Sequence, residues 1–196
     1  MKPAQAFLVA AALILCGCAH TYPSSDAALK GDQLKVPREF INGTASLAQA
    51  KAWTASLLSE PNAEPTLEIV EEDLNQDGTK DLLVAETHRA GTGGNSYLAF
   101  ETTPKGYRYL GELFYGALRV LPKERTGSQK MLTMSCLGSG DCTVQLTMLD
   151  ADGFHEVAKA EIAAGDSGTD EGNRLADALF RAETVSPEIL KQVFGR

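Results

Sequence analysis

The sequence is poor in residues that commonly carry chemistry, with three histidines, one tryptophan and four cysteines among 196 residues. None of the histidines, His20, His88 and His155, lies in a recognisable catalytic or zinc-binding motif. The sequence also lacks a phosphate-binding loop and the glycine-flanked serine turn of many hydrolases. Its best polar cluster, Thr-His-Arg at residues 87–89, is more typical of a solvated strand end than of an active site. The sequence therefore predicts no catalytic residues, and the alternative is an enzyme whose site is assembled from scattered residues.

Positive charge is also scarce, because 18 lysines and arginines face 26 aspartates and glutamates, for a net charge of −8. Binding to a nucleic acid needs a basic patch that neutralises phosphates, and the sequence has no such cluster. We therefore expect no nucleic-acid partner. Internal repeats are missing as well, so the greater part of the chain is expected to form one domain.

The first residues have the pattern of a secretory signal. Lys2 precedes an apolar run over residues 4–15, which is too short to cross a bilayer, since about 20 apolar residues are needed for that. The next residues, Leu-Cys-Gly-Cys at 15–18, resemble the lipobox of bacterial lipoproteins. The resemblance implies that residues 1–17 are a signal peptide and that lipid on Cys18 holds the chain on a membrane.

An ordinary signal peptide that leaves Cys18 free is the alternative to lipidation. Cys16 is a weaker candidate for the lipid, because the bulky Leu15 precedes it. Ala19 stands where an aspartate would retain a Gram-negative lipoprotein at the inner membrane. The resemblance then implies a lipid-anchored protein of the cell envelope, sorted in a Gram-negative host to the outer membrane and facing the periplasm.

The two remaining cysteines, Cys136 and Cys142, are expected to form a disulfide. Outside the inner membrane the environment is oxidising, so pairing is the default for two leftover cysteines. The five residues between them include Gly138 and Gly140, which let the chain turn back. A zinc site is the alternative, but two thiolates without a nearby histidine make an incomplete ligand set.

The order of predicted elements indicates an α+β domain. Residues 18–44 are polar and turn-rich and are expected to form a tether, although the run at 36–41 is apolar enough to contact the domain. The domain itself is expected over residues 45–196. A helix over residues 47–59, capped by Ser46, carries Trp53, which we expect to anchor it to the core.

After the first helix the sequence changes to short apolar runs between turn signals. Strands are expected over residues 66–72, 81–88, 96–103, 107–114, 130–137, 142–150 and 154–162. The Asp-Ala-Asp-Gly run at 150–153 predicts a hairpin whose acidic side chains satisfy the turn backbone. Residues 163–174 are expected to be a loop, followed by helices over 173–182 and from the cap residue Ser186 onward. We expect a mainly antiparallel sheet of about six to seven strands, flanked by an N-terminal helix and C-terminal helices.

One segment has the pattern of a calcium loop. Residues 73–81 read DLNQDGTKD, with oxygen-bearing side chains at the first, third, fifth and ninth positions and glycine at the sixth. Calcium prefers six to eight oxygen ligands, and a loop that curls around the ion directs alternate side chains inward. The expected ligands are the side-chain oxygens of Asp73, Asn75, Asp77 and Asp81 and the backbone carbonyl oxygen of Thr79. The alternative is a metal-free turn in which the carboxylates accept backbone N–H groups.

The loop and its flanking strand-like runs resemble the calcium loop of the FG-GAP or VCBS repeats of integrin-type propellers. The EF-hand is a poorer match, because Val84 stands at the twelfth position where an EF-hand has glutamate. A propeller needs several such repeats and this sequence has one, so the resemblance does not imply a full propeller. It fits better a single strand–loop–strand unit inside an α+β domain of a secreted protein or lipoprotein.

These observations predict a membrane-anchored envelope lipoprotein with a structural calcium loop, acting as a non-enzymatic binding or structural module. The expected partners are the membrane, through lipid on Cys18, and another envelope protein or a glycan. The alternative function is an envelope hydrolase or another enzyme. A cleft that joins His88 or His155 to a carboxylate and a nucleophile would favour the enzyme. A surface with aromatics such as Tyr97, Tyr107 and Tyr115 would favour recognition.

Overall fold

The computed structural model describes residues 35–58, 64–87, 93–123, 127–137, 140–165 and 169–195. The chain divides into two units, Met1–Lys35 and Val36–Arg196, and almost all the described residues belong to the second. The expected signal peptide, Cys18 and most of the expected tether lie outside the described residues, as do His20 and His88. Within the described residues, no helix combines the length and the apolar character needed to cross a membrane.

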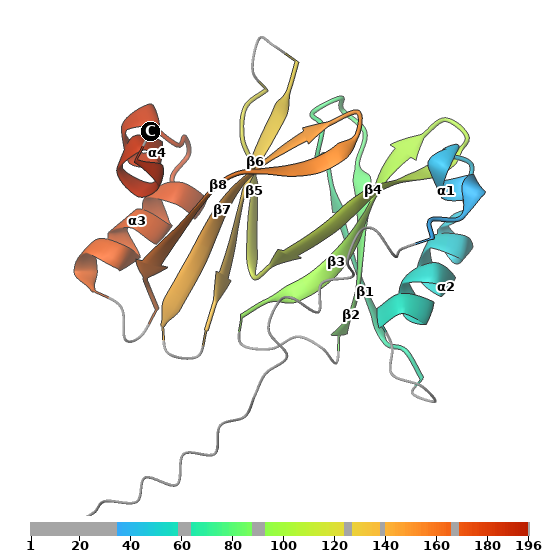
Figure 1. Cartoon of the computed structure of the whole chain (residues 1–196), viewed down its shortest axis with the longest axis horizontal. Helices are drawn as coiled ribbons and strands as arrows, with labels where there is room; N and C mark the ends of the chain where they lie inside the picture. The colour runs from blue at the N-terminus through green and yellow to red at the C-terminus, as the bar shows by residue number, and fades with distance from the viewer. Residues whose placement is uncertain are drawn as a thin grey trace, which may run out of the picture. The chain divides into compact units, whose positions relative to one another are not determined.

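The second unit contains, in its described residues, two four-stranded antiparallel sheets in which neighbouring strands follow one another along the chain (Figure 1). The first sheet consists of β1 (Leu67–Glu72), β2 (Asp81–Glu86), β3 (Asn95–Thr103) and β4 (Gly106–Tyr115). The second consists of β5 (Ala117–Val120), β6 (Gln129–Cys136), β7 (Asp141–Asp150) and β8 (Gly153–Ala163). The predicted α+β class and antiparallel pairing are confirmed, with two sheets where one main sheet was expected.

Helices cover one face of each sheet. α1 (Arg38–Ile41) and α2 (Leu47–Leu58) pack on the first sheet, against β2 and β4. α3 (Asp170–Phe180) and α4 (Pro187–Phe194) pack on the second sheet, against β8. Figure 1 shows the two helical pairs on opposite sides of the two sheets. The unit is therefore built in four layers, in the order helices, sheet, sheet and helices.

Three apolar cores separate these four layers. β2 shows how one strand serves two of them, because Leu82 and Val84 face the N-terminal helices while Leu83 and Ala85 face the second sheet. Trp53 of α2 stacks on Phe40 of α1 at 4.6 Å between ring centroids, and so anchors its helix as predicted. The third core joins the second sheet to α3 and α4 and contains Leu132, Val144, Ile162, Leu175 and Leu179.

The helix boundaries follow from local capping. Ser46 and Gln49 form a reciprocal capping box, in which each residue's backbone N–H donates to the other's side-chain oxygen. Thr169 caps α3 by accepting from the N–H of Gly172. Ser186 caps α4 in the same way, with proline at the first helical position as predicted.

Two elements differ from the prediction, and one apolar run agrees with it. The second unit begins at Val36, and Phe40 of the short helix α1 is 1% exposed, so the run at 36–41 contacts the core as expected. α3 begins at Asp170, inside the run expected to be a loop, since its threonine cap overrides the glycine within the first turn. β5 was not predicted, because its four residues offer too short a pattern to distinguish from a loop.

Two glycines are required where layers approach closely. A Cβ atom on Gly172 would lie 1.3 Å from the carbonyl oxygen of Ala163, so the first turn of α3 lies directly on the end of β8. A Cβ atom on Gly111 would lie 2.9 Å from the ring of Phe154, and φ of this residue is +142°. The second contact is where β4 of one sheet meets β8 of the other. Glycine therefore sets the spacing of the layers at both positions.

Candidate calcium loop and inter-sheet cleft

The predicted calcium loop connects β1 to β2, which pair as an antiparallel hairpin. Two of its residues have left-handed backbone conformations, Gln76 with φ of 53° and Gly78 with φ of 88°. These conformations curl the segment tightly between the two strand ends. The glycine at the sixth position therefore serves the bend for which the sequence pattern requires it.

Side-chain oxygens of the loop are directed at its own backbone. The two carboxylate oxygens of Asp73 accept the N–H groups of Asp77, at 3.1 Å, and of Gly78, at 2.9 Å. Asn75 Oδ1 also accepts the N–H of Asp77, at 2.9 Å. Asp77 Oδ1 accepts the N–H of Thr79 at 2.7 Å, which is the main cause that lowers the pKa of Asp77. Three of the predicted ligands thus fix the loop as a series of Asx turns.

Asp81 occupies a different environment at the start of β2. It is 1% exposed, and its two carboxylate oxygens accept the N–H groups of Leu74, at 3.1 Å, and of Thr102, at 2.9 Å. Burial raises the pKa of Asp81 to about 6, against the opposing effect of these two donors. The negative charges of Asp77 and Glu101 raise it further. Asp81 therefore joins the loop to the neighbouring strand β3 as an internal bridge.

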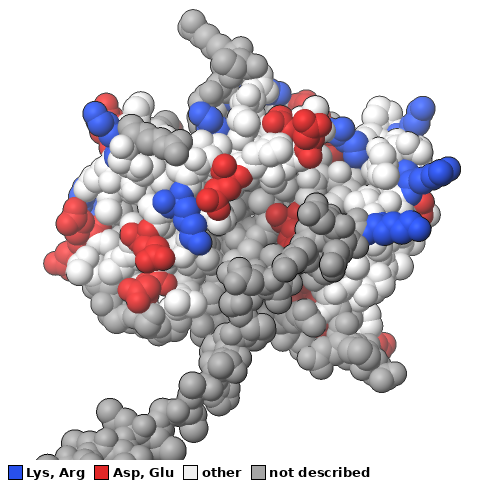
Figure 2. Space-filling model, in the orientation of Figure 1, with Lys and Arg blue, Asp and Glu red and all other residues white. Residues whose placement is uncertain are grey.

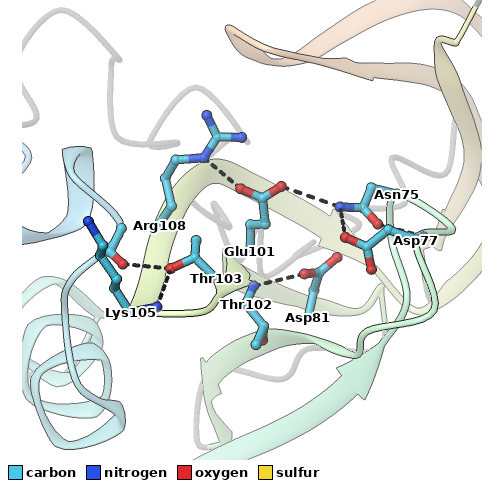
Figure 3. Close-up of polar contacts among 9 residues, drawn as sticks. Asn75, Asp77, Asp81, Glu101, Thr102, Thr103, Lys105 and Arg108 are labelled. Atoms are coloured by element: carbon cyan, nitrogen blue, oxygen red, sulfur yellow. Dashed lines mark hydrogen bonds and ion pairs between the residues drawn. The ribbon is translucent and has the colours of Figure 1, made fainter.

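Glu101 of β3 is a fourth carboxylate beside this loop, and the sequence did not indicate it. Figure 3 shows it between Arg108 and Asn75: its Oε2 accepts from Arg108 Nε at 2.7 Å and its Oε1 from Asn75 Nδ2 at 3.3 Å. Its position depends on the pairing of β2 with β3 and on the register shift after Ala99. A side chain placed by strand register leaves no local signal in the sequence.

The loop residues have the chemistry that calcium requires. All the predicted ligands are hard oxygen donors, and a carboxylate offers about four lone-pair sites, of which the N–H bonds use one or two. Among the described residues, however, no three carboxylate, histidine or cysteine side chains converge closely enough to hold a metal as they stand. The arrangement is that of the hydrogen-bonded turn, with lone pairs remaining on Asp73, Asp77 and Asp81. Thr79, whose carbonyl oxygen was the expected fifth ligand, is exposed.

The loop at residues 73–81 is also hydrogen-bonded to the segment that follows β5 of the second sheet. Gln76 Nε2 donates to the carbonyl oxygen of Leu121 at 3.0 Å, and Gln76 Oε1 accepts the N–H of Lys123 at 2.9 Å. Lys123 Nζ returns to the carbonyl oxygen of Asn75 at 3.0 Å. Both partner residues follow β5, the first strand of the second sheet. The loop therefore links the two sheets at one end of the layered unit.

The two cysteines lie opposite one another at the ends of β6 and β7. Cys136 is the register partner of Cys142, and their sulfur atoms are bonded in a disulfide. This agrees with the pairing expected from the sequence. At the other end of β7, Asp150 Oδ1 accepts the N–H of Asp152 at 2.8 Å in the expected hairpin turn. That N–H is also the main cause that lowers the pKa of Asp150.

A second feature, which the sequence did not indicate, is a cleft of about 490 Å³ between the two sheets. We call it the inter-sheet cleft. Its lining residues come from β1, β3, β4 and β5 and are Glu68, Val70, Glu72, Tyr97, Tyr115, Leu118, Arg119 and Val120. Tyr97 and Tyr115 stack with ring centroids 4.5 Å apart. Both tyrosines are buried and Tyr107 packs against the helix-side core, so these three residues do not form the exposed aromatic surface that would favour recognition.

The residues weighed for catalysis do not come together in the part of the chain that the structure describes. His155 Nε2 lies 3.1 Å from Asp150 Oδ1 on an exposed turn, and no serine, threonine or cysteine hydrogen-bonds to that ring among the described residues. His88 lies outside the described residues. On the face drawn in Figure 2, lysines and arginines are interspersed with aspartates and glutamates.

In comparisons with protein-family models, with curated proteins and with solved structures, nothing matches this chain.

Proposed function

We propose that this chain is a lipid-anchored protein of the cell envelope, a non-enzymatic binding or structural module whose calcium loop holds its two sheets together. The observation that carries the proposal is the loop at residues 73–81. Its acidic side chains fix a tight bend, and its Gln76 and Asn75 contact the segment after β5. A cation bound there would stabilise the junction of the sheets.

The number of carboxylates beside the loop supports a bound cation in addition to the hydrogen bonds of the turn. Asp73, Asp77, Asp81 and Glu101 place four carboxylates around one short segment, and the cations there are Lys80 of the loop and the neighbouring Lys123 and Arg108. Mutual repulsion of these carboxylates costs free energy that a divalent ion would offset. Calcium when bound supplies charge neutralisation and crosslinks the oxygens; its task here is structural. Outside the cytoplasm, calcium is plentiful enough for a site of modest affinity.

The calcium proposal is tested by thermal unfolding of the full-length chain, purified in mild detergent, with calcium or with chelator. Calcium-binding modules outside the cell have dissociation constants of about 10⁻⁴–10⁻³ M, so about 10 mM calcium should stabilise the fold by about 1.4–2.7 kcal/mol. For a unit of this size that raises the melting temperature by about 3–10 °C.

A matched pair of variants identifies the site. Asp77→Ala should abolish the calcium-dependent rise, whereas Asp152→Ala, in the acidic turn between β7 and β8, should retain it. Equal melting temperatures of the unsubstituted protein in calcium and chelator, together with no calcium by elemental analysis, would refute the proposed ion.

The membrane anchor is tested separately by metabolic labelling with radioactive palmitate in a bacterium that processes lipoproteins. The unsubstituted chain and Cys16→Ala should both incorporate label and fractionate with membranes, since alanine completes the small-residue pattern before Cys18. Cys18→Ala should incorporate none. Label that persists in Cys18→Ala, or that is lost in Cys16→Ala, would contradict lipidation at Cys18.

A further inference from the structure

The inter-sheet cleft is lined by strands of both sheets. β1 and β5 are the edge strands of their sheets, and residues from both strands line the cleft. On β1, the side chains of Glu68, Val70 and Glu72 lie on one face of the strand, because alternate residues of a strand share a face. Two carboxylates thus flank an apolar side chain along one wall, and Leu118 and Val120 form the opposite wall.

The charge of the cleft is predominantly negative. Glu68 Oε2 accepts the hydroxyl of Tyr97 at 2.9 Å, and Glu72 is exposed at the end of β1. Arg119 also lines the cleft, but its guanidinium donates to the carbonyl oxygens of Leu179, at 3.1 Å, and Glu183, at 2.8 Å. These two contacts direct the guanidinium toward the C-terminal end of α3, whereas Glu68 and Glu72 line the cleft.

Tyr115 supplies an independent observation. It lines the cleft, is only 8% exposed, and its buried hydroxyl has no hydrogen-bond partner among the described residues. Leaving a buried hydroxyl unpaired is unfavourable, so such groups are rare, and a water, an ion or another bound group often completes them. Burial is the main cause that raises the pKa of Tyr115, and the nearby carboxylates of Glu68 and Glu72 raise it further.

We propose that the inter-sheet cleft binds an organic cation, an ammonium or guanidinium group on an apolar stem. An ammonium group offers three N–H donors and a guanidinium five, which matches the several acceptors of Glu68, Glu72 and the Tyr115 hydroxyl. The apolar stem fits between Val70 and the side chains of Leu118 and Val120. An anionic ligand would face two carboxylates and is excluded by repulsion.

Two sources can supply this cation: a free amine or guanidine, and an arginine or lysine side chain of a peptide. The inference rests on the proposed function in one respect, namely that the module binds rather than catalyses. None of the predicted calcium ligands lines the cleft, so a failure of cation binding leaves the melting and palmitate experiments unaffected.

The test is isothermal titration calorimetry on the full-length chain in mild detergent. The probes are agmatine, a capped Gly-Gly-Arg-Gly-Gly peptide, and the same peptide with neutral citrulline in place of arginine. The arginine peptide or agmatine should bind at least tenfold more tightly than the citrulline peptide, and added salt should weaken the binding. The tighter of the two cationic probes identifies the source.

Variants on the two faces of β1 give the matched control. Glu72→Gln should reduce the affinity for the cationic probe at least tenfold, whereas Glu71→Gln, on the opposite face of the same strand, should leave it unchanged. Tyr115→Phe should also reduce the affinity for the cationic probe. Without probe, the melting temperature of this variant should equal or exceed that of the unsubstituted protein, because the substitution removes an unpaired buried hydroxyl.

Three outcomes would overturn the proposal. One is no binding of either cationic probe up to about 10 mM, a concentration that reveals even weak sites. Another is equal binding of the arginine and citrulline peptides, which would leave an apolar cleft without charge recognition. The third is an equal loss of affinity in Glu71→Gln and Glu72→Gln, which would attribute the effect to the net charge of the protein rather than to the cleft.

Discussion

Removing the disulfide should lower the stability of the second sheet by a predictable amount. Cys136 and Cys142 are separated by six positions and close a short loop at the ends of β6 and β7. The chain-entropy relation for a loop of this length gives about 2 kcal/mol at 25 °C. For a domain of this size we expect the melting temperature to fall by about 4–8 °C.

The substitution is Cys136→Ala together with Cys142→Ala, measured by circular dichroism during thermal and urea unfolding. Alanine is preferred to serine because Cys142 is 1% exposed, and a buried hydroxyl would add an unrelated penalty. With a thiol-free reductant, the unfolding midpoint of the unsubstituted protein should decrease to that of the double variant, since both lose the same covalent constraint. The double variant itself should not respond to the reductant, which excludes effects of the other cysteines.

A change below about 0.5 kcal/mol would refute the entropic reasoning, because surface substitutions without structural consequence fall within that range. It would mean that the β6–β7 hairpin closes this loop without help from the covalent bond. The backbone bonds Leu137 N–H to Asp141 O, at 2.8 Å, and Gly140 N–H to Leu137 O, at 2.9 Å, already hold the hairpin together.

Three further predictions address single positions. Gly172→Ala should lower the free energy of unfolding in urea by more than about 3 kcal/mol, because the added Cβ would overlap the carbonyl oxygen of Ala163. A decrease below about 1 kcal/mol would contradict this close contact. Ser186→Ala should cost about 0.5–2 kcal/mol by loss of the cap on α4, and Ser186→Asp should restore most of it. The pKa of the Asp150 carboxyl, measured by carbon NMR, should lie below 3.8. Because this pKa is lower in the folded than in the unfolded state, the carboxylate stabilises the fold above pH 3.8. That stabilisation is lost as the pH falls through the pKa of the folded state. His155→Ala should retain most of that shift, because the N–H of Asp152 is its main cause.

The elements with strong local signals could be predicted from the sequence. The first long helix carries a serine cap and an apolar stripe, and the structure places it at Leu47–Leu58. The Asp-Gly dipeptide marks the hairpin at residues 150–153, and the structure pairs Asp150 with Gly153 there. Such features depend on a few adjacent residues, so their sequence patterns are sufficient to locate them.

The features that depend on packing between layers could not be predicted. Glu101 lies beside the loop at residues 73–81 only because of strand register, and the inter-sheet cleft is formed by strands of two different sheets. Tyr115 has the alternation of an ordinary strand residue, and nothing local indicates that its hydroxyl is buried without a partner. Sequence reasoning therefore identified the loop but not its neighbouring carboxylate, and it did not reveal the cleft.

The loop at residues 73–81 and the inter-sheet cleft are connected through β1, which lines the cleft and ends where the loop begins. Glu72 is the last residue of β1 and the register partner of Asp81, the first residue of β2. β1 is an edge strand that pairs within its sheet only with β2, and the loop at residues 73–81 follows directly after Glu72. Order in the loop therefore fixes the position of Glu72 in the cleft wall. An ion that stabilises the loop would also preorganise the cleft, because less conformational entropy would remain to be lost when a cation binds there.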